Sequence, residues 1–242
     1  MRTVTALLTN KAYGYPTRGA RWRRKPTILA CLHQTANAHA TARQERDYAN
    51  RAGSWGASAT AYIDRDGTIV RAIDPAKYAA WSQGDVAHPN TKIPTIAAAV
   101  ASGVNMNEWV HESIECSGAG TEPYTDAQFE AVARLVAAAS KALGLPVNRS
   151  TVVVHADINS VSRRSDPWPP ATREARIKRV IARANALLRP PIVTVTVKAG
   201  DTLSEIASAH GLTLAALLAL PENARYRANP GLIHPGDIIR VK

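Results

Sequence analysis

The sequence predicts an α/β domain with a central mixed β-sheet flanked by helices, followed by a small βααβ domain. Three observations predict this organisation. Short apolar runs that suit strands alternate with amphipathic helical patterns through most of the chain. The segment Arg189-Pro190-Pro191 then ends a helical pattern, and the valines of 193–197 alternate with polar residues as in a strand. We therefore expect one domain over 1–189, a linker over 190–192 and a second domain over 193–242.

Local signals within the first domain favour particular elements. Apolar runs predict strands at about 28–32, 59–63, 68–73, 113–116 and 151–154. Asp66-Gly67 is typical of a hairpin turn between two of these strands. Helical patterns cover about 125–143 and the residues after Pro169-Pro170 to 188, with a weaker one over 41–51. Thr125 and Gln128 have the spacing of a capping box, so a helix should begin there.

Composition narrows the function classes. Thirty Lys and Arg against 19 Asp and Glu give a net charge of +11, which favours polyanionic partners such as nucleic acid, anionic lipid or a cell-wall polymer without choosing among them. The basic cluster at 21–25 suits either a solvated arm or a polyanion-binding patch. No apolar stretch reaches the roughly 20 residues of a transmembrane helix, and the first residues lack a signal-peptide pattern. Cys31 and Cys116 are expected to be buried free thiols.

Two histidines stand at the ends of predicted strands. His33 follows the apolar run 28–32, and His155 follows 151–154, so a rigid sheet can aim both side chains. The loop 157–167 after His155 supplies carboxylates and cations. Two imidazoles and one carboxylate, with a fourth position left for water, are what a catalytic zinc ion needs. Spacing alone does not prove such a site.

Several blocks between about 25 and 185 together resemble the type 2 N-acetylmuramoyl-L-alanine amidases. In order, these are Leu32-His33-Gln34-Thr35, SATAYIDRDG at 58–67, Ala80-Trp81-Ser82-Gln83-Gly84, Ser113-Ile114-Glu115, and His155-Ala156-Asp157 with Arg164-Ser165-Asp166-Pro167. The family includes phage lysins, cell-wall recycling amidases and the related peptidoglycan recognition proteins. The resemblance implies one zinc ion held by His33, His155 and Asp166.

The same resemblance implies roles for other residues. Glu115 would polarise the zinc-bound water or handle the proton, and Arg164 would stabilise the oxyanion where many members carry Lys. The guanidinium of Arg spreads its charge over a larger plane than the ammonium of Lys. The chain also departs from the family at Ala59-Thr60, where many members have Tyr-His, and at Ser82, where they have His. Trp81 is a candidate for the substrate groove, although packing explains a lone tryptophan about as well.

The C-terminal residues resemble a LysM domain. Thr202 and Glu205 form a second capping box, and the GDTL and I-x-PG-x signatures of that family are both present. The resemblance implies binding of N-acetylglucosamine-containing glycans through two loops. The candidate contact residues are Gly200, Asp201, Thr202, Leu203, Gly231, Leu232 and Ile233.

The resemblances together predict a zinc-dependent amidase that cleaves the bond between N-acetylmuramic acid and L-alanine in peptidoglycan, and we expect it to be a phage endolysin. Such a protein would be made in the host cytoplasm without a signal peptide, reach the wall after holin-mediated release, and need no specific nucleic acid as partner. One alternative is a recognition-type protein that binds peptidoglycan without cleaving it. The other is a basic nucleic-acid-binding protein.

Overall fold

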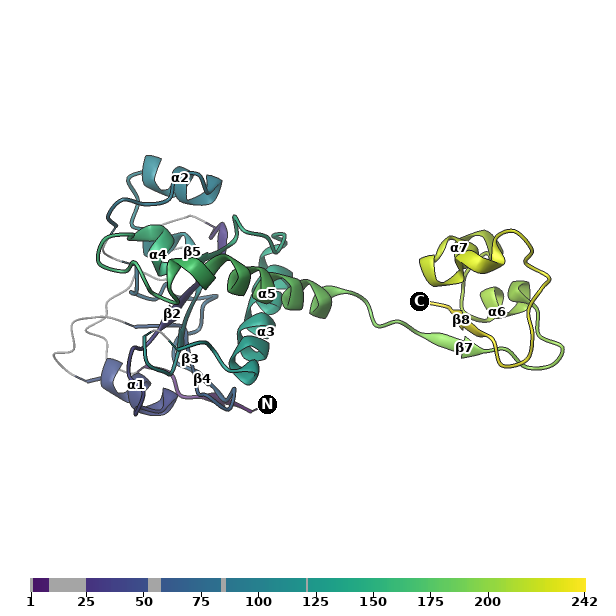
Figure 1. Ribbon diagram of the computed structural model, residues 1–242, viewed down its shortest axis with the longest axis horizontal. Helices are drawn as coiled ribbons and strands as arrows, with labels where there is room; N and C mark the ends of the chain where they lie inside the picture. The colour runs from purple at the N-terminus through teal and green to yellow at the C-terminus, as the bar shows by residue number, and fades with distance from the viewer. Residues whose placement is uncertain (1, 9–24, 52–57, 84–85, 121) are drawn as a thin grey trace. The chain divides into compact units, whose positions relative to one another are not determined.

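The chain forms two compact units, Met1–Leu188 and Arg189–Lys242, in a computed structural model (Figure 1). The structure describes residues 2–8, 25–51, 58–83, 86–120 and 122–242. Most of the basic cluster at 21–25, and Gly84 of the tryptophan-containing motif, lie outside the described residues. Each unit is described by itself.

The first unit is built on a mixed sheet, as predicted, and the described residues contribute six strands to it. Its strands, in the spatial order β1-β4-β3-β5-β2-β6, are Thr3–Thr5, Ile69–Arg71, Ala61–Ile63, Val110–Cys116, Ile28–Gln34 and Val152–Val154. Every pair is parallel except β3 and β4, which form the expected antiparallel hairpin. Gly67 closes that hairpin at a φ of 83°, a conformation that suits glycine. The edge strand β1 was not predicted.

Helices cover both faces of the sheet. They are α1 (Ala42–Ala49), α2 (Pro94–Ala101), α3 (Asp126–Leu143), α4 (His155–Ile158) and α5 (Pro170–Leu188), with a short 3-10 turn η2 at Met106–Glu108. The pair α3 and α5 shares a large apolar core with Leu32 and Ile114 of the sheet. On the other face, a smaller cluster joins Cys31 to Ile96 of α2. Strand β2 is therefore buried along its whole length, as central parallel strands usually are.

Local signals account for where the helices begin and end. Thr125 and Gln128 form the predicted capping box, and α3 ends at Gly144 in the left-handed conformation. Helix α1 begins after another capping box at Thr41. Helix α2 has no side-chain cap and was not predicted.

The second unit has the predicted βααβ order. Strands β7 (Thr194–Thr196) and β8 (Ile238–Arg240) pair in antiparallel fashion, and α6 (Leu203–Ala209), α7 (Leu214–Ala219) and the 3-10 helix η3 (Pro221–Tyr226) lie between them in the chain. Leu217 and Ile239 are completely buried at the centre of its core. The buried Asn223 amide donates to the carbonyl oxygens of Leu217 and Arg240, which links helix and strand.

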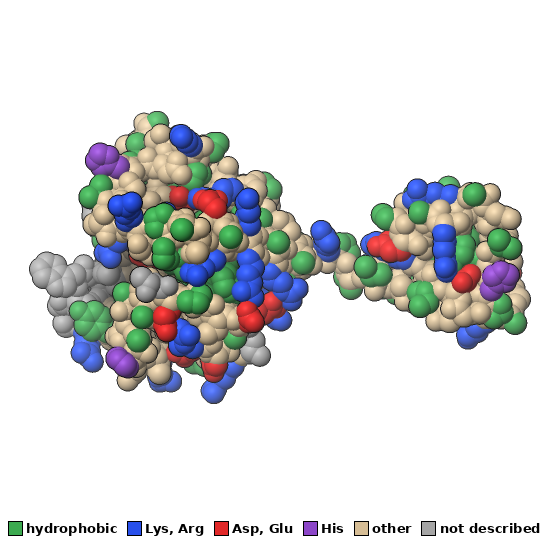
Figure 2. All heavy atoms as spheres, viewed as in Figure 1, with side chains coloured by type: hydrophobic (Ala, Val, Ile, Leu, Met, Phe, Trp, Pro, Cys, Tyr) green, Lys and Arg blue, Asp and Glu red, His purple; other side chains and the backbone are tan. Residues whose placement is uncertain are grey.

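Basic and acidic side chains are intermixed on the surface. Arg179 pairs with Asp126, and Arg183 pairs with Glu130, so these ion pairs tie α5 to α3. Figure 2 shows the same mixture of Lys, Arg, Asp and Glu over the face it draws. Throughout the described part of the chain, every helix is too short or too polar to span a bilayer.

Candidate metal centre and active site

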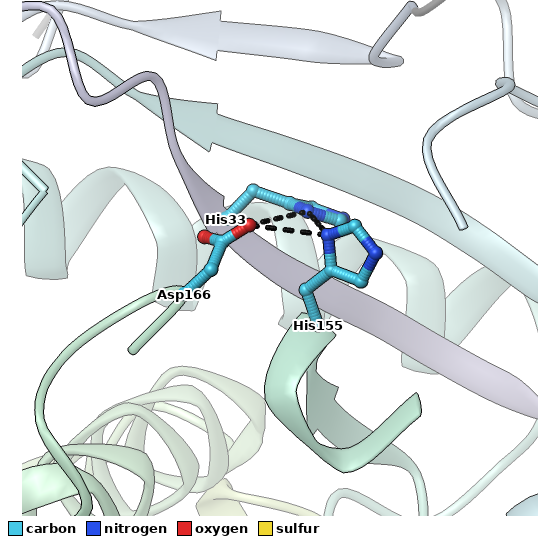
Figure 3. A group of neighbouring side chains, drawn as sticks. All are labelled: His33, His155 and Asp166. Atoms are coloured by element: carbon cyan, nitrogen blue, oxygen red, sulfur yellow. Dashed lines mark hydrogen bonds and ion pairs between the residues drawn. The ribbon is translucent and has the colours of Figure 1, made fainter. Parts of the chain in front are cut away.

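Parallel strand pairing brings the two predicted histidines together. His33 lies near the C-terminal end of β2, and His155 begins α4 directly after β6. These two strands are parallel neighbours, with Leu32 opposite Val154, so their C-terminal ends meet at one edge of the sheet. Asp166 approaches the same point from the loop before α5 (Figure 3).

The three side chains converge on one point. His33 Nδ1 lies 3.0 Å from His155 Nδ1, which lies 3.1 Å from Asp166 Oδ2. His33 Nδ1 lies 3.7 Å from the same Oδ2. Within the described ranges, this is the group of His, Cys, Asp and Glu residues whose donor atoms lie close enough together to hold a metal ion. Two imidazole nitrogens and a carboxylate oxygen form a donor set that suits zinc.

The pKa values of the three side chains show how charge is distributed at this point. Burial lowers the pKa of His155 to about 4, so its imidazole is neutral at pH 7, as a metal ligand must be. Burial opposes ionisation of Asp166, but hydrogen bonds from His155 and His33 outweigh it and hold the pKa of this carboxyl well below its usual range. Burial likewise opposes a charge on His33, yet the hydrogen bond to Asp166 raises its pKa well above 6.5. The partly buried Asp166 carboxylate therefore favours positive charge at this point.

Backbone contacts hold two of the ligands in place. The backbone N–H of Gln34 donates to Asp166 Oδ1 at 2.9 Å, which leaves Oδ2 facing the histidines. The buried hydroxyl of Tyr124 donates to the carbonyl oxygen of His33. Tyr124 in turn packs edge-on against Trp168, with ring centroids 4.6 Å apart.

Glu115 lies beside the metal centre without joining it. It is the residue of β5 directly opposite His33 on the neighbouring parallel strand, so both side chains leave the same face of the sheet. Its side chain is partly exposed, but Oε2 is buried and has no hydrogen-bond partner among the described residues. Burial is the main cause that raises the pKa of Glu115 to about 7. A carboxyl that titrates near neutral pH is suited to transfer protons.

Arg163 and Arg164, in the loop before α5, differ in what the structure shows of their link to this site. Arg164, the residue that the motif indicates, is exposed, and its carbonyl oxygen accepts a hydrogen bond from Arg173. The positive charge of its neighbour Arg163 partly offsets the rise in the pKa of Glu115 and adds to the lowering of the pKa of His155. Sequence reasoning missed Arg163, and only its position next to Arg164 could have pointed to it.

At the departures from the family pattern, the chain has internal hydrogen bonds. The hydroxyl of Thr60 donates to Glu112 Oε2 at 2.5 Å, and Ser82 Oγ bonds to Ser113 Oγ. Trp81 is 39% exposed, so part of its ring is open to a ligand.

Both cysteines are buried free thiols, as expected. Burial raises the pKa of the Cys31 thiol, which disfavours the thiolate form that binds metals. Cys31 is also outside the group of converging donor atoms, although it lies two residues before His33 on β2.

The predicted glycan-binding residues of the second unit fall into two kinds. Gly231 and Leu232 are exposed, and Leu232 keeps 59% of its surface open. Leu203 instead lies in the core, so its side chain is unavailable to a glycan. Thr202 caps α6, and Asp201 accepts a hydrogen bond from the Lys198 backbone. The remaining two candidates are the exposed Gly200 and the partly buried Ile233.

Comparisons with known proteins agree with this architecture. The solved structures that resemble the chain include a mutant form of PlyL, with 16% identity and a TM-score of 0.52 over 77% of this chain and 99% of that one. The Staphylococcus aureus hydrolase AmiA in complex with its ligand has 16% identity and a TM-score of 0.51 over 77% and 83% of the respective chains. A selenomethionine derivative of AmpD has 21% identity and a TM-score of 0.50 over 74% and 93%. At these identities the likeness shows the fold.

Family models identify the family of each unit. A comparison with curated proteins finds no match. The family model described as N-acetylmuramoyl-L-alanine amidase matches residues 23–169, which is more than half of the chain, and the LysM domain model matches residues 195–242. The chain therefore belongs to the N-acetylmuramoyl-L-alanine amidase family, whose members hydrolyse peptidoglycan, and it carries a C-terminal LysM domain.

Proposed function

We propose that the chain is a zinc-dependent amidase that hydrolyses the bond between the lactyl group of N-acetylmuramic acid and L-alanine. The observation that carries this proposal is the convergence of His33, His155 and Asp166 within 4.8 Å. Their donor atoms suit zinc, and the ion would leave a coordination position open for water or substrate. When bound, zinc would supply Lewis-acid activation of water and of the scissile carbonyl group.

Glu115 is proposed to move the proton. Its carboxylate takes a proton from the attacking water and delivers it to the nitrogen of the leaving L-alanine, so the C–N bond breaks as a C–O bond forms. The products are a free lactyl carboxyl group and a new amino terminus. The raised pKa of Glu115 allows both halves of this transfer near neutral pH.

A cationic loop is proposed to stabilise the negative charge that develops on the carbonyl oxygen. The family resemblance assigns this role to Arg164, and the electrostatic effect of Arg163 on the pKa of Glu115 supports a contribution from a second positive charge. Both arginines belong to the proposal and can be tested separately.

The groove next to this centre is the proposed place for the substrate. A hollow of about 480 Å³ is lined by Thr35, which follows the metal-site strand, and by Glu45, Tyr48 and Arg51 of the α1 region. Glu45 also acts on the pKa of Glu115, which indicates that the hollow lies close to the proton-transfer group. The partly exposed Trp81 is a further proposed substrate contact.

The LysM unit is proposed to hold the enzyme on its polymer. Gly200, Asp201 and Thr202 in one loop, and Gly231, Leu232 and Ile233 in the other, are the proposed glycan contacts, whereas Leu203 contributes through its backbone. A tethered wall-binding module raises the effective concentration of peptidoglycan at the catalytic unit. This catalytic-plus-binding layout supports an endolysin role, with holin-mediated access to the wall.

Metal analysis combined with product mass spectrometry tests the enzymatic proposal. We expect stoichiometric zinc in the purified protein and new L-alanine amino termini in digested peptidoglycan, with both lost in His155→Ala. Undiminished cleavage after exhaustive chelation would overturn the zinc mechanism. Folded, zinc-free protein that sediments with sacculi but releases no product would instead favour a recognition protein.

Expression in bacteria tests the endolysin role. Cells that produce the protein together with a phage holin should lyse, whereas cells that produce it with an inactive holin should not. Lysis that does not depend on the holin would contradict this part of the proposal.

A further inference from the structure

A completely buried glutamine contacts the nitrogen of His33 that faces away from the metal centre. Gln83 has no exposed surface, and its side-chain Nε2 lies 2.9 Å from His33 Nε2. The same amide nitrogen lies 3.1 Å from Ser113 Oγ. The other end of the amide, Gln83 Oε1, is buried without a hydrogen-bond partner among the described residues.

The direction in which His33 points decides which of its nitrogens carries hydrogen. His33 Nδ1 faces His155 and Asp166, so it must present a lone pair if these residues hold a metal ion. A neutral imidazole then carries its hydrogen on Nε2 and needs an acceptor there. An amide nitrogen cannot serve, because it is itself a donor.

Rotation of the Gln83 amide by half a turn resolves this conflict. The oxygen and nitrogen of an amide are nearly identical in shape, so their positions follow from the hydrogen bonds they make. With the oxygen in place of the nitrogen, its two lone pairs accept from His33 Nε2–H and from the Ser113 hydroxyl. The same rotation moves the amide nitrogen to the buried position of the oxygen, where the described residues offer no hydrogen-bond partner.

The backbone around Gln83 is held by a separate buried side chain. Asn107 Oδ1 accepts the backbone N–H of Gln83 at 2.7 Å and that of Ser82 at 2.9 Å. Asn107 is itself buried. These hydrogen bonds fix the backbone from which the amide reaches His33, next to Ser82, where the chain departs from the family pattern.

We propose that Gln83 is a positioning residue whose side-chain oxygen accepts the Nε2 hydrogen of His33 and so keeps Nδ1 available for the metal. This inference rests on the proposed zinc site. Partners of this kind orient metal-bound histidines, and their loss typically weakens metal binding by about 10- to 100-fold.

Zinc affinity and the nuclear magnetic resonance of the zinc-loaded full chain test the proposal. Gln83→Met removes the acceptor at similar volume and should weaken zinc binding about 10- to 100-fold in a chelator competition. Gln83→Glu keeps an acceptor and should bind zinc at least as tightly as the parent. The Nε2 hydrogen resonance of His33 should move upfield in Gln83→Met and downfield in Gln83→Glu, since a stronger acceptor deshields it.

Gln128 offers a matched control. It is also completely buried, and its amide donates to the carbonyl oxygens of Ile63, the last residue of β3, and Ser117, which follows β5. Gln128→Met should lower stability without changing zinc affinity. Equal zinc affinity in the parent and Gln83→Met, or equal weakening in both Met variants, would overturn the assignment of Gln83.

Two further outcomes keep the interpretations separate. If Gln83→Met does not fold, the resonance of Gln83→Glu decides, and an unshifted or upfield position contradicts the hydrogen bond. If the parent binds no zinc, or if His155→Ala binds it equally well, the proposed zinc site fails and this inference fails with it. Tight zinc binding by the parent with no effect at Gln83 rejects only the positioning role.

Discussion

The buried carboxyl of Glu115 should make the stability of the metal-free protein depend on pH. Its pKa rises from 4.5 to about 7 on folding, mainly through burial. Between these values the folded protein keeps a proton that the unfolded chain has released, so the free energy of unfolding falls as pH rises. At roughly 1.36 kcal/mol per pKa unit, this rise corresponds to about 3 kcal/mol, an upper bound because water reaches part of the side chain.

Chemical denaturation at a series of pH values, in the presence of a chelator, measures this effect. Glu115→Gln cannot ionise, so the stability of the parent minus that of the variant should fall from about pH 4.5 to about pH 7 and then level off. Glu130→Gln is the control of opposite sign. Hydrogen bonds from Arg183 and Arg134 lower the pKa of Glu130, so the parent should lose its advantage over this variant as pH falls below about 4.5. A difference for Glu115→Gln that stays flat or increases from pH 4.5 to 7 would refute the reasoning.

Further predictions test the zinc site, the two loop arginines and the LysM unit one at a time. Added zinc should raise the Tm of the metal-free parent in a thermal scan but not that of His155→Ala, and equal shifts would place the metal elsewhere. Arg164→Ala should lower kcat by about 10²- to 10³-fold at unchanged Tm, because its side chain is exposed, and unchanged kcat would remove it from the mechanism. Arg163→Ala should move the pH–rate limb of Glu115 to higher pH, because its charge lowers that pKa, and an unmoved limb would count against the assignment. Ile239→Ala should cost the LysM unit about 2 to 5 kcal/mol and weaken pelleting with sacculi, whereas zinc content should stay at the parent level.

Elements with strong local signals were predictable. The capping boxes at Thr125 and Thr202 act between residues three apart, and the structure begins α3 and α6 directly after them. The Asp66-Gly67 hairpin and the antiparallel pair it joins are equally local. Strand β1 and helix α2 lack such signals, because three residues show no periodicity and α2 has no side-chain cap. Their places depend on packing against the rest of the sheet.

Residue roles were harder to predict than elements. The LysM signature indicated Leu203 as a binding residue, but the structure places its side chain in the core. A short motif contains both candidate glycan contacts and residues that shape the loop, and burial in the structure separates the two kinds. The contact of Gln83 with His33 had no signal in the sequence, since it joins residues 50 positions apart.

By itself, the sequence indicated the fold class, the starts of α3 and α6 and the candidate ligands, because capping, turn and motif signals act over a few neighbouring residues. Only the tertiary structure decided that His33 and His155, 122 residues apart, bring their Nδ1 atoms to 3.0 Å. The physical reason is that parallel pairing of β2 with β6 depends on burying both faces of the sheet under helices. No short stretch of sequence contains that packing.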